Sequence, residues 1–162
     1  MRAHADRDDR RGIWRRLALV GPTGEFLTRR GLDLRIFGLY VHRIRQADPG
    51  LDLHDHPWSF VSIVLRGGYV EERAEIRRAP QYAEWSDRTL DGRRGWLATW
   101  RAGSVHRVRL DEAHRIVEVE PGTVTLVLRG RKLRAWGFYL ETGWVDQRAY
   151  DYEARRPLRE ER

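Results

Sequence analysis

The chain contains no cysteine, which excludes disulfide bonds and thiolate metal ligands. Any bound metal must therefore use imidazole, carboxylate or water, which directs attention to the six histidines. No apolar run approaches the roughly 20 residues that cross a bilayer. The charged segment Arg2–Arg16 also lacks the apolar stretch of a signal peptide, so we expect no membrane association and a cytoplasmic location.

Lysine is nearly absent, since Lys132 is the only one, and the formal net charge of +7 comes from arginine. Clustered cations would favour nucleic acid, because they bind phosphates and release counterions. Here acidic residues interleave with the arginines at 6–11, 71–78 and 153–162, and no recognition motif is present. Nucleic-acid binding is therefore not expected.

A chain of 162 residues is about one domain long. We expect an N-terminal extension over residues 1–33 with a short helix around Ile13–Val20, a β-barrel over 34–145 and a charged C-terminal tail over 146–162. Turn residues separate the β-type segments, which is typical of a sandwich or barrel. The expected strands are Leu34–Arg45, Phe60–Leu65, Tyr69–Glu72, Trp96–Trp100, His106–Leu110, Arg115–Glu120, Thr123–Leu128 and Leu133–Leu140. The polar stretch Arg73–Arg94 predicts a loop or partial helix.

The sequence His54-Asp55-His56 is the strongest local signal for chemistry. Two histidines separated by one residue on a strand point to the same side and can chelate one ion. The same face continues with Trp58, Phe60, Ser62 and Val64, which predicts that the pair lies at the mouth of a largely dry interior. The alternative is a pair of surface residues or hydrogen-bonded core groups.

The spacing of this segment resembles the first cupin motif, in which His-x-His is followed by Glu and then, after six intervening residues, by Gly. Phe60 stands where that motif has Glu, and six residues separate it from Gly67. A second match begins at Gly95 and leads through Arg101-Ala102-Gly103 to His106 and Leu110, where the second motif has Gly, Pro-x-Gly, His and Asn. The resemblance covers Leu34–Leu140. It implies an all-β fold, the cupin double-stranded β-helix or jelly-roll barrel, to which we add the short N-terminal helix.

The resemblance also implies one divalent transition metal on His54, His56 and His106, because Phe60 cannot replace the missing glutamate. Fe(II) is favoured, with Zn(II), Ni(II), Mn(II) and Cu(II) as alternatives. Three-histidine cupins include thiol dioxygenases and ring-cleaving dioxygenases, and this chain resembles them in ligand set only. The aromatic end of the chain, Trp136–Val145, resembles small uncharacterised cupins of bacteria and phages.

Further residues have candidate roles near this site. His42 is a possible second-shell residue or fourth ligand, with a structural role as the alternative. We expect His114 to face solvent, Glu118 to be an exposed charge rather than a replacement carboxylate, and Asp55 to point away from the metal. An inward arginine would indicate an anionic substrate, and Arg35, Arg101 and Arg134 are candidates. The predicted pocket walls are Tyr40, Trp58, Phe60, Ser62, Trp100 and Trp136.

These features favour a metal-dependent enzyme, a dioxygenase-like protein that acts on a small molecule inside the barrel. The alternatives are a metal-dependent isomerase or lyase and a non-catalytic ligand-binding or structural module. A homodimer formed through edge strands is a further expectation.

Overall fold

The computed structural model describes residues 2–5, 14–21, 24–78, 88–90, 95–151 and 154. Within these ranges every regular element is a β-strand. The strands are β1 (Arg2–Ala5), β2 (Trp14–Gly21), β3 (Gly24–Asp33), β4 (Gly38–Ile44), β5 (Leu53–His54), β6 (Phe60–Arg66), β7 (Gly68–Arg78), β8 (Arg88–Leu90), β9 (Trp96–Arg101), β10 (Val105–Val108), β11 (Glu112–Val119), β12 (Thr123–Arg129), β13 (Gly137–Leu140) and β14 (Gly143–Asp146).

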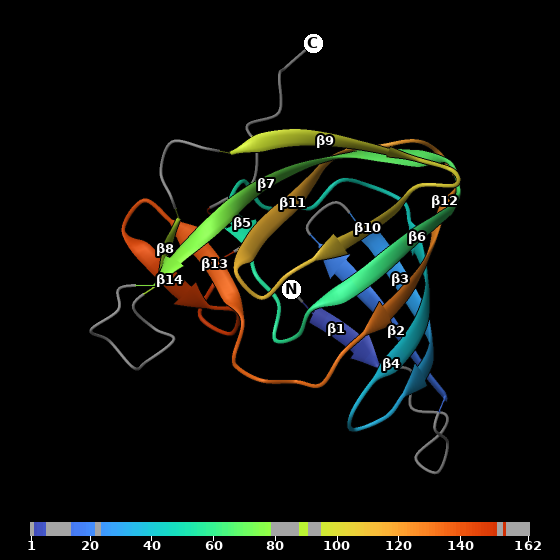
Figure 1. Cartoon of the computed structure of the whole chain (residues 1–162), viewed down its shortest axis with the longest axis horizontal. Coiled ribbons are helices and arrows are strands. Elements are labelled where there is room, and N and C mark those ends of the chain that lie inside the picture. The colour runs from blue at the N-terminus through green and yellow to red at the C-terminus, as the bar shows by residue number, and fades with distance from the viewer. Residues whose placement is uncertain are drawn as a thin grey trace.

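The strands form two sheets that face each other (Figure 1). The first sheet has the order β1-β2-β3-β4-β12-β6-β10, and the second has β14-β13-β5-β11-β7-β8, with β9 also paired to β7. From β4 to β7 the chain alternates between the sheets, and it does so again from β9 to β12. All pairings are antiparallel. This arrangement confirms the predicted jelly-roll barrel.

The expected N-terminal helix is wrong, because the described part of that segment is strand β2. Strand β2 pairs with β3 in the registers Leu17↔Arg29 and Leu19↔Leu27. Leu17 and Leu19 both line the interior cavity, so the apolar residues repeat with the period of a strand rather than that of a helix. Strand β3 in turn pairs with β4, so the segment before residue 34 extends the first sheet of the barrel.

The expected loop or partial helix over Arg73–Arg94 is also wrong where the structure describes it, since β7 continues to Arg78 and its end pairs with β8. The polar composition of this segment suggested a loop, but part of it is buried in the sheet. Arg73, for example, is 5% exposed and donates to Glu112 Oε2 at 2.6 Å. Ala74 and Ile76 pack with Leu53, Ala113 and Tyr139 in a small core. Residues 79–87 and 91–94 of the expected loop lie outside the described ranges.

A second apolar cluster lies between the sheets and fills one part of the interior. It consists of Ile44, Val64 and Tyr69, with Leu27, Trp100, Ile116 and Val119 packed against it. Burial of these side chains supplies the main driving force for closing the barrel. The cavity described below borders this cluster, because Leu27, Ile44, Tyr69 and Ile116 also line it.

Asp55 fixes the strand that carries the paired histidines. Its side chain is 0% exposed and accepts hydrogen bonds from the Gly137 backbone N–H at 2.8 Å and the Tyr139 hydroxyl at 2.9 Å. Arg134 lies 3.3 Å from the same carboxylate and donates to the backbone oxygens of His56 and Leu110. Asp55 therefore bonds the neighbouring strand β13, while His54 and His56 face the cavity.

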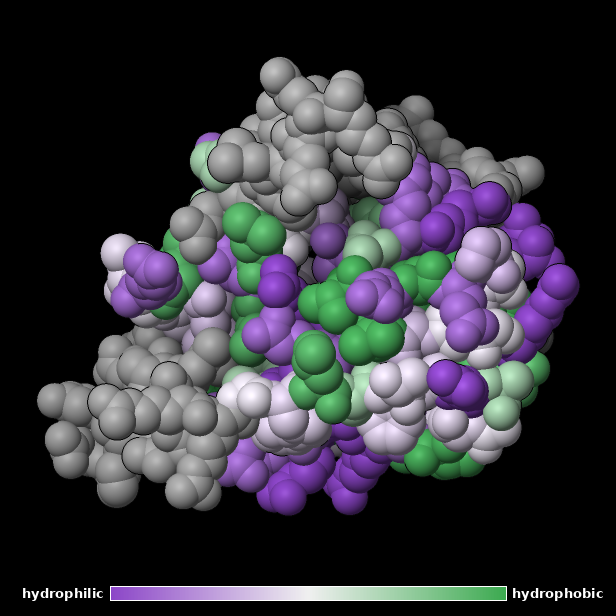
Figure 2. Space-filling view, turned by 90° about the horizontal axis from the view of Figure 1, so that it is seen from above, coloured by the Kyte–Doolittle hydropathy of each residue, from purple (hydrophilic) through white to green (hydrophobic). Residues whose placement is uncertain are grey.

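The outer surface combines charged and apolar side chains. No helix in the described ranges is long and apolar enough to span a membrane. Strand β9, at the top of Figure 1, exposes Trp96 and Leu97. Figure 2 views the molecule from that side and shows hydrophobic residues gathered near the middle of the face, beside hydrophilic ones. The homodimer stays a prediction.

Candidate metal centre

A cavity of about 270 Å³ lies between the two sheets. Apolar and aromatic side chains dominate its wall, which is typical of small-molecule sites. The predicted wall residues Tyr40, Trp58, Phe60, Ser62 and Trp136 line it, and Phe138 and Val127 add to the apolar surface. Trp100 is not among the lining residues and stacks on His106, with ring centroids 4.1 Å apart.

Three histidines converge on this cavity from two neighbouring segments of the second sheet. His54 ends β5, His56 follows it, and His114 lies on β11 directly opposite His54 in the strand register. One nitrogen from each residue lies within 4.8 Å of the other two. The Nε2 atoms of His56 and His114 are 2.6 Å apart, so in one pair of tautomers one of them donates to the other. The site therefore brings three imidazole nitrogens that can act as metal ligands close together.

The expectation that His114 faces solvent is wrong, because its side chain is buried at 7% exposure. The turn before it ends at Asp111, and the chain has already entered β11 at Glu112. The antiparallel pairing of β11 with β5 then turns His114 toward the same side as His54. His-x-His spacing could not reveal this partner, because it depends on a pairing between strands distant in sequence.

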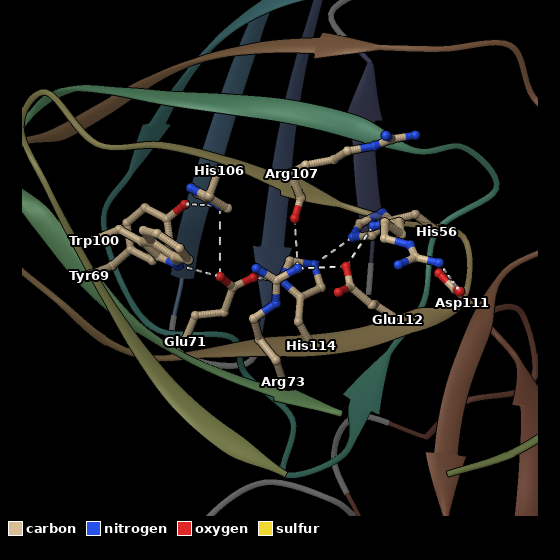
Figure 3. A network of polar contacts seen from close by, with 11 residues as sticks. His56, Tyr69, Glu71, Arg73, Trp100, His106, Arg107, Asp111, Glu112 and His114 are labelled. Carbon is tan, nitrogen blue, oxygen red and sulfur yellow. Dashed lines mark hydrogen bonds and ion pairs between the residues drawn. The ribbon is translucent and has the colours of Figure 1, made fainter. Parts of the chain in front are cut away.

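His106 lies apart from this group, although the motif spacing suggested it as the third ligand. It is on β10 in the first sheet, opposite Ser62 of β6. Its Nε2 is 3.2 Å from the Tyr69 hydroxyl and 3.8 Å from Glu71 Oε2. Figure 3 shows Glu71 between His106 on one side and His114 on the other. The structure thus brings together His54, His56 and His114, and separates His106 from them by a carboxylate.

Carboxylates lie behind two of the three converging rings. His114 Nδ1 donates to Glu71 Oε1, and Glu71 Oε2 accepts from Trp100 Nε1 at 2.6 Å. Asp48 Oδ2 lies 3.9 Å from His54 Nδ1 and accepts from the Ile116 backbone N–H at 2.8 Å. A carboxylate at Nδ1 fixes the ring and leaves the Nε2 lone pair directed at a metal, as it does in many metal sites. Sequence analysis missed both Glu71 and Asp48.

Burial keeps the imidazoles of His54 and His56 neutral, and neighbouring groups keep Glu71 ionised. Burial lowers the pKa of His54 and of His56 well below the ordinary value, and the charge of His114 lowers both further. Burial alone would raise the pKa of Glu71, but the charge and hydrogen bond of His114, followed by His106 and Arg73, lower it to about 2. Neutral imidazoles at His54 and His56 and an ionised carboxylate at Glu71 are protonation states that suit metal binding.

The remaining candidates have other positions. His42 lines the cavity on β4 but lies outside the group of three converging nitrogens. Glu118 is exposed, as are Arg35 and Arg101. Arg134 is buried against Asp55, away from the cavity wall. The arginines that do line the cavity are Arg29 and Arg129, which sequence analysis missed.

The donor set fits a divalent transition metal. Three imidazoles with carboxylate support match catalytic metal sites that keep a position open for water or substrate. Oxygen-preferring ions such as Mg²⁺ and Ca²⁺ fit poorly, because all three converging donors are nitrogen. The residues of this chain can therefore hold a metal with imidazole preference next to an apolar cavity.

The chain was compared with known proteins by sequence and by structure. No family model and no curated protein sequence matches the chain. Among solved structures, Fe(II)-bound HppE with the alternative substrate (S)-1-HPP matches with a TM-score of 0.51 and 12% identity, over 80% of this chain and 63% of that one. Oxalate decarboxylase from Bacillus subtilis matches with a TM-score of 0.48 and 14% identity, over 90% and 31%. A putative mannose-6-phosphate isomerase from Ralstonia eutropha matches with 0.45 and 17%, over 70% and 91%.

The likeness to HppE shows a shared fold and, at this identity, no more than that. It agrees with the fold that the sequence motifs had suggested. From the topology, the interior cavity and this match, the chain is a cupin-fold protein, a jelly-roll barrel with a three-histidine cluster at its interior wall.

Proposed function

We propose that this protein is a metal-dependent cupin enzyme that binds a divalent transition metal on His54, His56 and His114 and acts on a small molecule inside the barrel. The observation that carries the proposal is the convergence of three histidine nitrogens at the wall of an apolar cavity, two of them with a carboxylate behind. In this proposal His114 takes the place that the motif spacing gave to His106.

The protein side of the chemistry follows from the contacts. Glu71 holds a proton on His114 Nδ1 and so keeps Nε2 available as a ligand. Trp100 holds the other oxygen of Glu71, which fixes the carboxylate. The aromatic wall excludes water and strengthens electrostatic interactions in the cavity. A bound ion would supply a Lewis acid with open positions, and Fe(II) would add reactivity toward dioxygen.

Oxygen uptake separates the oxygenase hypothesis from its rivals. We would load untagged protein with Fe(II) or, as the redox-inert control, with Zn(II), and screen small organic acids for oxygen consumption and product mass. Turnover with Fe(II) and none with Zn(II) supports an oxygenase. Turnover with both metals and no oxygen uptake favours the isomerase or lyase, and tight binding without product favours the binding module.

Glu71 gives a sharper test of the metal centre. Replacing Glu71 by glutamine should weaken metal binding by about 10- to 100-fold, because glutamine is uncharged and has one acceptor oxygen, whereas Glu71 accepts from both His114 Nδ1 and Trp100 Nε1. The measurement is a competition titration of Zn(II) against a chromophoric chelator. Glu72→Gln is the matched control, since Glu72 bonds Arg115 and does not line the cavity. Equal Zn(II) affinities of E71Q and the wild type would show that Glu71 does not support His114 as a metal ligand.

A further inference from the structure

The cavity has a cationic wall opposite the three histidines. Arg29 on β3 and His42 on β4 are direct cross-strand partners in the first sheet, and both line the cavity. The three histidines lie on the second sheet, across the same space. The Arg29 guanidinium carbon is 4.6 Å from the centre of the Tyr40 ring, so the cation lies over an aromatic face in the interior.

His42 presents a buried nitrogen that the protein does not satisfy. Its Nε2 has no hydrogen-bond partner in the described part of the chain. Burial, followed by the charge of Arg29, lowers the pKa of this imidazole to about 3, so the ring is neutral. Leaving a buried polar atom without a partner costs stability, and such atoms are rare in native proteins. In one tautomer the Nε2–H of His42 can donate to a ligand in the cavity.

Three further charged groups line the cavity wall. Asp48 accepts from Ile116 and lies near His54, while Asp52 accepts from the Tyr150 hydroxyl at 2.8 Å. Arg129 pairs with Asp33 and lies over Trp58 at 4.8 Å. Around them the wall is aromatic, which suits a flat apolar body.

We propose that Arg29 and His42 form a carboxylate-binding subsite, so that the small molecule of this cavity is an organic acid with an apolar or aromatic body. This inference rests on the proposed function, because an acid held there would direct its other end toward the three-histidine centre. A guanidinium binds a carboxylate with two parallel hydrogen bonds, and the neutral His42 N–H adds a third donor.

Calorimetric titration of Zn(II)-loaded protein with benzoate, benzamide and inorganic phosphate tests the subsite. Benzamide keeps the shape of benzoate without the charge, and phosphate has the charge without the apolar body. The variants are R29Q, R29K and H42F. Arg30→Gln is the matched control, because Arg30 is exposed on the neighbouring position of the same strand. Repeating the benzoate titration on H114A separates the subsite from the proposed metal.

We expect benzoate to bind the wild type more tightly than benzamide or phosphate. R29Q should weaken benzoate binding about tenfold or more, as expected for losing a charge-assisted pair. H42F should weaken it about threefold or more, since a neutral donor contributes less. R29K should bind benzoate more weakly than the wild type but more tightly than R29Q, because lysine keeps the charge and loses the two parallel hydrogen bonds. R30Q should match the wild type, and benzamide binding should not respond to R29Q.

Three results would overturn the subsite. Benzoate binding that survives R29Q but disappears in H114A would show that the carboxylate goes to the metal, which leaves the proposed function intact. Phosphate binding as tight as benzoate would exclude an organic acid as the preferred class. Absence of benzoate binding to the wild type would also refute it. If instead the protein takes up no metal yet R29Q still weakens benzoate binding, the subsite holds and the proposed function fails.

Discussion

Replacing His114 by alanine is expected to weaken Zn(II) binding on the order of 1,000-fold, as strongly as replacing His54. The reason is that His114 supplies one of three converging nitrogens and the one with an ionised carboxylate behind it. Competition titration against a chelator and elemental analysis of untagged protein measure the effect.

The His106→Ala variant is the informative comparison. His106 lies beyond Glu71 and outside the converging group, so this variant should bind Zn(II) within about tenfold of the wild type, the range of an outer-shell change. A loss of metal in H106A together with full binding in H114A would restore the ligand set that the motif spacing suggested. Circular dichroism of both variants checks that the barrel is folded.

Replacing Asp55 by alanine is expected to lower the free energy of unfolding by about 3–5 kcal/mol. The change leaves the Arg134 guanidinium, whose side chain is 0% exposed, without its carboxylate. It also removes the acceptor of the Gly137 N–H and the Tyr139 hydroxyl. Urea denaturation followed by tryptophan fluorescence measures the effect.

Asp111→Ala is the matched control for that experiment. Asp111 pairs with Arg109 at 2.6 Å, but both side chains are more than half exposed, at 54% and 60%. Such surface pairs contribute less than about 1 kcal/mol. If D55A destabilises the protein no more than D111A does, the buried pair is not what holds β5 against β13. Metal affinity should also fall in D55A, because β5 carries His54.

The local patterns of the sequence predicted much of the barrel. Turn residues between β-type segments placed most of the strands, and the two spaced motifs indicated the jelly-roll topology. The alternation after His54 predicted an aromatic cavity wall, and Trp58, Phe60 and Ser62 do line the cavity. These predictions were correct because the two-residue period of a strand appears directly as an alternation of residue types in the sequence.

The spacing of residues in the sequence could not identify the third histidine of the cluster. His106 and His114 both lie on strands, and only the pairing of β11 with β5 decides which of them faces His54. The contact of Glu71 with His114 could not be predicted for the same reason, because the two residues lie on neighbouring strands of the second sheet. Side-chain partners fixed by long-range pairing leave no local periodicity to detect.

The helix predicted in the N-terminal segment was wrong for a different reason. Its apolar run is short enough to suit either a helix or a strand, and pairing with β3 decides for the strand. Treating the segment as an external extension also concealed Arg29, which β3 directs into the cavity. The cation proposed to bind substrate therefore lay outside the expected barrel.

Anomalous diffraction at the zinc edge from crystals of Zn(II)-loaded wild-type protein tests the central claim most directly. The account predicts one strong peak at about 2.0–2.1 Å from a nitrogen of each of His54, His56 and His114, next to the aromatic cavity. A peak between His106 and Glu71, or no peak in the barrel interior, would contradict it.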